Sequence, residues 1–262
     1  MFDTTALTAH LRHPLPNIVL YNTTDSTNLQ CKHLAEQDAP EGTLVIAGAQ
    51  SAGRGRLGRS FYSPADTGLY MSLLLRPTLP PTEALSITTC AAVCVCEAIE
   101  ALVGQHIQTG IKWVNDVFVG ERKVCGILTE AAFSPDGSAL RYAILGIGVN
   151  LCAPTDGFPT DIADIAAAVF GHTDTDLRPQ LAASIVDRFF DYYPHLSSKP
   201  FYEAYRERLI LRGKPVQILW GSGIGHGTCL DVDRDFRLLV QNEDGTVQAL
   251  SSGEVSVRPD QR

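Results

Sequence analysis

Strand signals cluster in residues 107–149, IQTGIKWVNDVFVGERKVCGILTEAAFSPDGSALRYAILGIGV. Apolar, β-branched runs alternate there with turn residues, of which Val119-Gly120-Glu121 and Pro135-Asp136-Gly137 are the clearest. We expect strands over Ile107–Trp113, Asp116–Val119, Val124–Ala132 and Leu140–Val149. Because the two-residue alternation of apolar and polar side chains is weak in several of them, we expect helices to cover one face of this sheet.

Further strand and helix patterns flank this stretch. On its N-terminal side we expect strands over Asn17–Tyr21, Gly42–Ala47 and Gly68–Leu75, and helices over residues 27–38 and Thr82–Val103. On its C-terminal side we expect helices over Ile162–Phe170, Arg178–Tyr193 and Pro200–Leu211. Strands and helices that do not alternate strictly indicate an α+β fold, with a mixed sheet covered by helices, rather than a doubly wound sheet.

The composition changes near Leu211-Arg212-Gly213. Beyond this point, turn residues separate short β-rich runs, which are Val216–Trp220, Thr228–Val232, Leu238–Gln241 and Glu254–Val257. Evenly spaced short strands over about fifty residues are typical of a small β-barrel. We therefore divide the chain into residues 1–211 and a small C-terminal β domain, residues 212–262.

The composition, 45% hydrophobic and 19% charged, is that of a soluble globular protein. The net charge of −8 argues against a fold-wide cationic surface for nucleic acid or anionic membranes. No run reaches the roughly 18 uncharged apolar residues of a membrane span, and the nearest, Ala84–Cys96, predicts a buried helix. The N-terminus lacks the pattern of a signal peptide. The seven cysteines form no CxxC pair, so we expect reduced thiols, core positions for Cys90, Cys94 and Cys96, and a cytoplasmic protein.

The segment Gln50–Arg59, QSAGRGRLGR, combines glycines with arginines after a predicted strand. Glycine lets a backbone approach a ligand closely, and the arginine fork matches carboxylate and phosphate oxygens. In an acidic chain, this local concentration of cations indicates an anion-binding loop. A solvated loop and an RG-rich loop that binds nucleic acid remain alternatives. The segment is not a P-loop, because no Gly-Lys-Ser/Thr follows.

Three later segments place polar residues or glycines at strand ends. Lys112–Asp116, KWVND, joins two predicted strands, and its Asp is suited to a divalent cation beside phosphates, although a hairpin turn is the better explanation of this segment taken alone. Lys123 enters an apolar strand, so it points either into a cleft or out from a hairpin end. Gly146–Asn150, GIGVN, closes a strand with glycines that mark either a close ligand or a bulge.

Taken together, these motifs follow one order along the chain: Ser26-Thr27-Asn28, Gln50, GRGRLGR, KWVND, RKVCGIL and GIGVN. The ordered set resembles the catalytic region of the biotin–protein ligases from about Asp25 to Leu151. The resemblance resumes over Gly213–Arg258, where GKPVQI and GEVSVR are similar to the C-terminal domain of that family. It implies a class II synthetase-like catalytic domain of the biotin/lipoate ligase type, followed by a small SH3-like β-barrel.

The resemblance implies a reaction in two steps. ATP and a magnesium ion would activate biotin, whose carboxylate attacks the α-phosphate to give biotinyl-5′-AMP and pyrophosphate. A lysine of a biotin carboxyl carrier protein, from acetyl-CoA carboxylase or a related carboxylase, would then attack the mixed anhydride and release AMP. Biotin and ATP would be substrates, and no permanently bound cofactor is implied.

The resemblance also implies roles for individual residues. Arg54, Arg56 and Lys123 would be catalytic, because cations offset the repulsion between a carboxylate and a phosphate. Biotin and the adenylate would be contacted by Ser26, Thr27, Asn28, Gln50, Gly53, Arg54, Gly55, Arg56, Trp113, Lys123, Gly126, Ile127, Gly146 and Gly148. The nucleotide and its phosphates would be contacted by Arg59, Lys112, Asn115, Asp116 and Asn150, with Asp116 on the magnesium ion. The proline that is usual in the KWPND pattern of this family is Val114 here.

Some members of this family carry an N-terminal winged-helix domain and repress transcription. Only 25 residues precede Ser26, so we expect a monofunctional ligase that binds neither DNA nor a membrane. Pairing of sheet edges could form a homodimer or receive the carrier protein. A lipoate or octanoate transferase or ligase of the same superfamily is one alternative, and a nucleic-acid-binding module is another. Binding of lipoate, or salt-sensitive binding of DNA or RNA, would support these alternatives.

Overall fold

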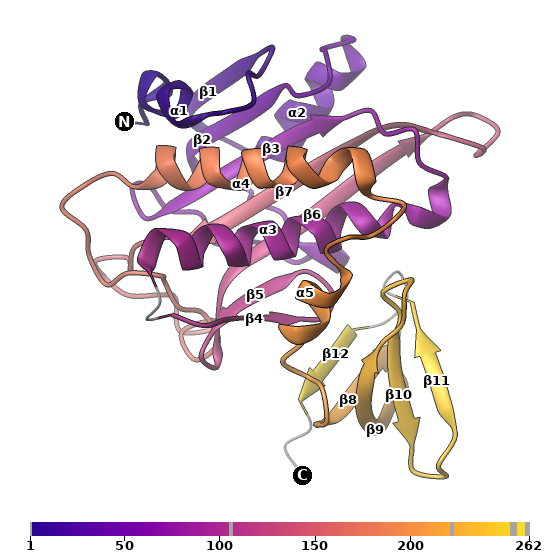
Figure 1. Cartoon of the computed structure of the whole chain (residues 1–262). Helices are drawn as coiled ribbons and strands as arrows, with labels where there is room; N and C mark the ends of the chain where they lie inside the picture. The colour runs from indigo at the N-terminus through magenta and orange to yellow at the C-terminus, as the bar shows by residue number, and fades with distance from the viewer. Residues whose placement is uncertain (1, 105–106, 221–222, 252–255, 260–262) are drawn as a thin grey trace.

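The structure, a computed structural model, describes residues 2–104, 107–220, 223–251 and 256–259. Its larger sheet has seven strands in the order β1-β2-β3-β7-β6-β5-β4 (Figure 1). These are β1 Ile18–Thr24, β2 Leu44–Gln50, β3 Gly68–Leu75, β4 Thr109–Lys112, β5 Asp116–Val119, β6 Arg122–Phe133 and β7 Leu140–Asn150. Only β1 and β2 pair in parallel within this described sheet, and every other neighbouring pair is antiparallel. The predicted α+β fold with a mixed sheet is confirmed.

Helices cover the two faces of this sheet unequally. The α-helices are α1 Thr4–His10, α2 Thr27–Glu36, α3 Leu85–Val103, α4 Arg178–Tyr192 and α5 Tyr202–Glu207. The long helices α3 and α4 lie side by side over one face (Figure 1). On the opposite face, α2 packs Cys31 and Ala35 against Val45, Leu74 and Ile144, and it leaves the ends of β6 and β7 uncovered for the site described below.

Helix α3 begins close to where the sequence predicts and forms the centre of the main core. Together with the short turn before it, the helix spans Pro81–Val103 and is long and apolar enough to cross a membrane. However, 72% of its apolar 18-residue stretch is buried inside the protein. It is therefore a core helix, as predicted from Ala84–Cys96. Cys90, Cys94 and Cys96 are fully buried free thiols, which confirms their expected core positions.

A second, antiparallel sheet follows the larger one, in the order β11-β10-β9-β8-β12. Its strands are β8 Pro215–Trp220, β9 Gly223–Val232, β10 Leu238–Asn242, β11 Val247–Leu250 and β12 Ser256–Pro259. The predicted small β domain is confirmed, although β11 was not expected and residues 254–255 of the predicted last strand lie outside the described residues. One hydrophobic core runs from the larger sheet into this one, so the division between residues 211 and 212 stays a prediction.

Two helix predictions after β7 need correction. Residues 162–170 form turns and not a continuous helix. The Ala166 N–H donates to the Ile162 carbonyl at 2.8 Å, but further backbone groups of the segment bond to the larger sheet. The Lys123 N–H donates to the Ile165 carbonyl at 2.8 Å, and the Ala167 N–H donates to the Lys123 carbonyl at 2.8 Å. The helix expected over Pro200–Leu211 is only α5. It ends at Glu207. The next residues pair with the edge strand β4, where the Ile111 N–H donates to the Arg208 carbonyl at 2.6 Å and the Ile210 N–H donates to the Ile111 carbonyl at 3.0 Å.

Candidate active site

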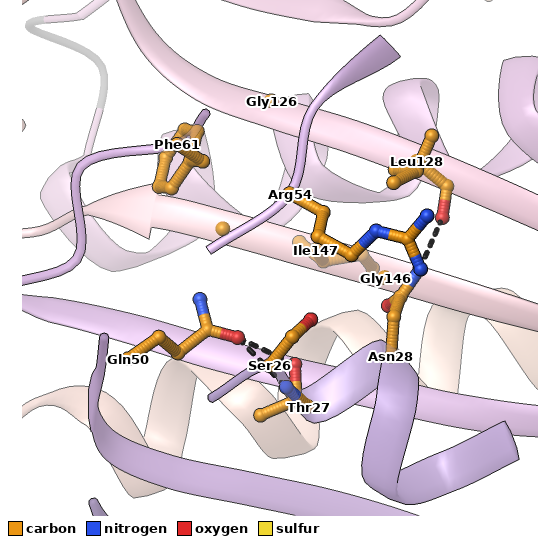
Figure 2. Close-up of a pocket in the computed structure, with 11 residues that line it drawn as sticks. Ser26, Thr27, Asn28, Gln50, Arg54, Phe61, Gly126, Leu128, Gly146 and Ile147 are labelled. Atoms are coloured by element: carbon orange, nitrogen blue, oxygen red, sulfur yellow. Dashed lines mark hydrogen bonds between the residues drawn. The ribbon is translucent and has the colours of Figure 1, made fainter. Parts of the chain in front are cut away.

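A pocket opens on the face that α2 covers only in part (Figure 2). Its wall is made by the N-terminus of α2, the end of β2, the hairpin after β2 and the facing strands β6 and β7. The lining residues are Ser26, Thr27, Asn28, Gln50, Arg54, Phe61, Gly126, Leu128, Gly146, Ile147 and Gly148. The structure therefore brings together eight of the predicted contact residues, Ser26, Thr27, Asn28, Gln50, Arg54, Gly126, Gly146 and Gly148.

Glycines on β6 and β7 make the floor of the pocket. A Cβ atom at Gly146 would lie 2.0 Å from Asn28 Oδ1, and one at Gly148 would lie 2.6 Å from the Phe61 ring. A Cβ at Gly126 would lie 3.0 Å from Lys123 Nζ. These positions have ordinary extended backbone, so the glycines serve close approach between side chains and sheet and not unusual backbone angles.

One end of the pocket is a network of neutral polar groups. The Thr27 N–H and hydroxyl both donate to Gln50 Oε1, at 2.8 and 3.1 Å, and Gln50 Nε2 donates to Ser63 Oγ at 2.9 Å. Ser26 is the N-cap residue of α2, but its side chain makes no capping hydrogen bond. Figure 2 shows Gln50, Ser26 and Thr27 together at this end.

Asn28 is fixed at both ends of its amide. Its Oδ1 accepts from the Ser72 hydroxyl at 2.6 Å, and its Nδ2 donates to Glu130 Oε2 at 2.8 Å and, less closely, to the Leu128 carbonyl at 3.4 Å. Ser72, on β3, is fully buried, and its oxygen lies 2.8 Å from Thr27 Oγ1. The amide is thus held in one orientation, which is a property of a site that recognises hydrogen-bonding groups.

The glycine–arginine segment folds into a hairpin over the pocket. The Phe61 N–H donates to the Gly53 carbonyl at 2.8 Å, and the Gly55 N–H donates to the Arg59 carbonyl at 2.7 Å. Gly53 is required here, because a Cβ atom would lie 2.4 Å from the Phe61 oxygen. From this hairpin the Arg54 side chain extends across the pocket (Figure 2) and forms a 3.1 Å ion pair with Glu130.

A second cationic group lies beside the pocket. Lys123 Nζ is 2.7 Å from Asp116 Oδ1 and 5.9 Å from the centre of the Phe61 ring. Arg56 donates to Asn115 Oδ1 at 3.1 Å, while Asn115 Nδ2 donates to the Ile127 carbonyl at 2.7 Å. Burial lowers the pKa of the Arg56 guanidinium, and the nearby Asp116 carboxylate opposes this shift. Lys123 and Arg56 therefore lie beside Asp116 and Asn115, whereas Arg54 reaches Glu130 next to the Asn28 amide.

Some predicted site residues face elsewhere. The Trp113 indole is buried between the two sheets and donates to the Phe236 carbonyl at 2.8 Å, so its predicted substrate contact has no support in this geometry. Ile127 likewise points its side chain into the core on the far face. Asn150 donates to the Ala167 carbonyl at 3.1 Å and so holds the segment after β7. Lys112 lies on the edge strand β4, outside the pocket lining.

Other residues of the site were not predicted. Phe61 and Leu128 line the pocket, and Glu130 and Ser72 hold Asn28. Strand parity could have identified Leu128 and Glu130, because residues two and four positions after Gly126 share its face of β6. No local sequence signal indicates Phe61 or Ser72, since their roles depend on contacts between distant segments.

The described residues contain no group of three or more His, Cys, Asp or Glu side chains that could hold a metal ion. Asp116 is the predicted metal ligand, and its carboxylate is paired with Lys123. Proteins commonly hold Mg²⁺ through one or two carboxylates together with substrate phosphates. The donor set therefore fits a magnesium ion that arrives with a nucleotide and does not fit a cage built from protein ligands alone.

Two family models match the chain. The model described as Biotin/lipoate A/B protein ligase family matches residues 20–150. The model described as Biotin protein ligase C terminal domain matches residues 212–258. The two matched ranges cover the larger sheet with its pocket and the second sheet, respectively.

The chain is also similar to individual proteins and solved structures. The bifunctional ligase/repressor BirA of Bacillus subtilis is 34% identical over 251 residues, which cover 90% of this chain and 73% of that protein. The biotin–[acetyl-CoA-carboxylase] ligase of Paracoccus denitrificans is 31% identical over 237 residues, covering 88% of this chain and 97% of that protein. Among solved structures, a biotin protein ligase from Aquifex aeolicus in complex with biotin and ATP superposes with a TM-score of 0.77 at 29% identity, covering 94% of this chain and 100% of that one.

Proposed function

Because this chain belongs to the Biotin/lipoate A/B protein ligase family and is a ligase of the biotin-activating kind, we propose that it biotinylates a carrier protein. It would convert biotin and ATP to biotinyl-5′-AMP and then transfer the biotinyl group to a lysine of a biotin carboxyl carrier protein. The acceptor would belong to acetyl-CoA carboxylase or a related carboxylase, as in the name of the Paracoccus relative.

The observation that supports this proposal best is the division of the pocket into two chemically different ends. Fixed neutral groups, the Asn28 amide and the Thr27–Gln50 pair, lie at one end. Lys123 supplies positive charge near Gly126, two residues along β6 from the strand position opposite Gly146, where Asn28 packs. Arg54 reaches the Asn28 end, where both side chains contact Glu130. Biotin has the matching shape, with a neutral ureido ring that both donates and accepts hydrogen bonds and an anionic carboxylate at the end of its chain.

In the first step the biotin carboxylate oxygen attacks the α-phosphorus of ATP, and the bond to the bridging oxygen breaks to release pyrophosphate. Two anions must approach one another, so cations already in place lower the barrier. We assign this role to Lys123, Arg54 and Arg56. Their present partners Asp116, Glu130 and Asn115 hold them near the pocket before substrates bind.

In the second step the neutral amine of the acceptor lysine attacks the acyl carbon of the mixed anhydride. An amide bond forms, the bond from the acyl carbon to the phosphate oxygen breaks, and AMP leaves with the charge. A free carboxylate is a poor acyl electrophile, whereas AMP is a good leaving group, which is why the first step is needed. The same cations would stabilise the departing phosphate.

Magnesium would enter this reaction bound to ATP. We propose that Asp116 contributes a carboxylate oxygen to it, which requires Lys123 to turn from Asp116 toward the anionic substrates. The ion would neutralise phosphate charge when bound. Arg59 and Lys112 are proposed to contact the nucleotide from the rim, and Asn115 and Asn150 to hold neighbouring backbone in place.

The remaining proposals concern location and partners. We propose a cytoplasmic enzyme, supported by described cysteines that are all free thiols. We also propose that it acts without binding DNA, given its net charge of −8. A mobility-shift assay at low salt tests the second point, and salt-sensitive binding to duplex DNA would contradict it. We propose that a homodimer, if it forms, does so by pairing exposed sheet edges. Sedimentation would test this.

Isothermal titration with biotin, followed by addition of ATP and magnesium, tests the proposed reaction. We expect biotin to bind on its own. Pyrophosphate should be released only when biotin, ATP and magnesium are all present. Lipoate serves as the competing ligand, and Lys32→Ala, an exposed change on α2, serves as the control variant. Binding of lipoate without binding of biotin would contradict the proposal and favour the lipoate alternative.

A further inference from the structure

Glu130 lies beside the pocket and contacts two of its lining residues, Asn28 and Arg54. It is located on β6, on the same face as Gly126 and Leu128. One carboxylate oxygen, Oε2, accepts from Asn28 Nδ2 at 2.8 Å. The other, Oε1, is 3.1 Å from Arg54 Nη1. About a third of the side chain is exposed, at 34%, so the carboxylate remains accessible to solvent and to ligand.

We propose that Glu130 is a specificity-determining positioning residue, which holds Arg54 by charge until an anionic ligand replaces it. The inference rests on the proposed function, because it takes biotin as the ligand. Arg54 has one guanidinium, and a Glu130 oxygen is its partner in the structure. A ligand carboxylate or phosphate must therefore exchange with Glu130 to gain that guanidinium, whereas a neutral ligand offers nothing for the exchange.

The same carboxylate also keeps Asn28 ready for a neutral ring. With Oδ1 held by Ser72 and Nδ2 held by Glu130, the Asn28 amide cannot rotate. Glu130 thus contacts both an amide suited to a neutral ring and a guanidinium suited to an anion. The two functions can be separated, because glutamine keeps a side-chain oxygen that accepts from Asn28 but gives up the charge that holds Arg54.

Titration with two probes, biotin and the uncharged biotin amide, separates these functions. We expect Glu130→Gln to bind biotin about two- to fivefold more tightly, because the biotin carboxylate no longer has to displace an exposed ion pair. Biotin amide should bind this variant as tightly as it binds the unchanged protein. When Glu130→Gln is combined with Arg54→Ala, the ratio of biotin affinity to biotin amide affinity should equal that of Arg54→Ala alone. Glu121→Gln, at the exposed turn before β6, is the matched control and should change neither affinity.

Each other outcome has a definite meaning. An equal change for both probes would show that Glu130 acts only through Asn28 and would overturn the exchange. So would an unchanged biotin affinity, or a ratio change that persists with Arg54→Ala, which would indicate direct repulsion of the ligand by Glu130. If the unchanged protein binds neither probe, the proposed function fails and this inference fails with it. A thermal melt of Glu130→Gln checks that the variant is folded.

Discussion

Strands β6 and β7 present very different surfaces to the two sides of the same sheet. Toward α3 and α4 they direct Ile127, Leu145, Ile147 and Val149, all of which are buried in one apolar core. Toward the pocket the alternate positions of the same strands carry glycines, with the side chains of Asn28, Phe61 and Lys123 packed against them. A period of two residues is enough to build a stabilising face and a binding face from one stretch of chain.

The contrast between the faces explains where mutations should act. On the core face, shape and apolar area matter, so that lost volume reduces stability. On the pocket face, the glycines matter because they have no side chain. An added side chain would displace the neighbouring groups that are proposed to bind the ligand. Substitutions at neighbouring positions of β7 should therefore have opposite effects on stability and on binding.

The largest effect on stability should come from the core face. Leu145→Ala removes a buried side chain that does not line the pocket, and we expect the free energy of unfolding to fall by about 2–5 kcal/mol. The affinity for biotin should be nearly unchanged in the protein that remains folded. Denaturant unfolding and titration with biotin measure the two quantities. A large loss of biotin affinity with little change in the free energy of unfolding would contradict the assignment of the two faces.

The largest effect on chemistry should come from a cation of the pocket. Lys123→Ala should lower the rate of adenylate formation by about 10²–10³, as for the loss of one preorganised group that stabilises developing charge. Pyrophosphate release measures this rate. The cooperative melt should persist, because the lysine side chain is partly exposed and packs little in the core. Loss of that melt would show that the Lys123–Asp116 pair is structural.

A smaller effect is expected from adding one methyl group beside Leu145. Gly146→Ala would place a Cβ atom 2.0 Å from Asn28 Oδ1, so Asn28 must move. Overpacking of this kind costs about 1–3 kcal/mol, and we expect biotin affinity to fall by about tenfold or more. Titration of Gly146→Ala alongside Leu145→Ala gives the comparison. Equal affinities in the two variants would contradict the role of the floor glycines.

The smallest effect concerns pH and the core face. Burial raises the pKa of the Cys96 thiol to about 12. The thiol stays protonated in the folded protein while it ionises in the unfolded chain, so the folded state binds more protons above the ordinary thiol pKa. Stability is then fully present below that ordinary value and is lost as pH rises toward 12. We expect a loss of about 1.4 kcal/mol per pH unit from this thiol.

Denaturant unfolding between neutral and alkaline pH measures this loss, and Cys96→Ala should make its pH dependence shallower. Cys152→Ala, at a thiol that is only partly buried, is the matched control. An unchanged slope in Cys96→Ala would contradict the assignment.

Much of the larger sheet and part of the site could be predicted from the sequence. The strands around residues 107–149 have clear turn residues between them, and Gly146 and Gly148 stand out within an apolar run. The ordered motifs pointed to most of the pocket lining. These features are local in the chain, and local patterns carry that information directly.

The features that could not be predicted depend on contacts between distant segments. Residues 162–170 have a helical composition, yet backbone bonds to Lys123 and Asn150 hold them as turns. Trp113 belongs to a recognisable motif, but its indole reaches the Phe236 carbonyl, in the connection between β9 and β10. Glu130 looks like an exposed strand residue until Asn28 and Arg54, far away in the sequence, are placed beside it.

The contact between Trp113 and Phe236 has a consequence for how the protein unfolds. Phe236 also stacks on Phe201, with ring centres 5.6 Å apart, and Tyr205 donates to the Val114 carbonyl at 3.1 Å. These buried aromatic groups join the small sheet to the turn that carries Asn115 and Asp116. The chain therefore has two topological units but one cooperative unit, and melting of the small sheet would also disorder the phosphate end of the pocket.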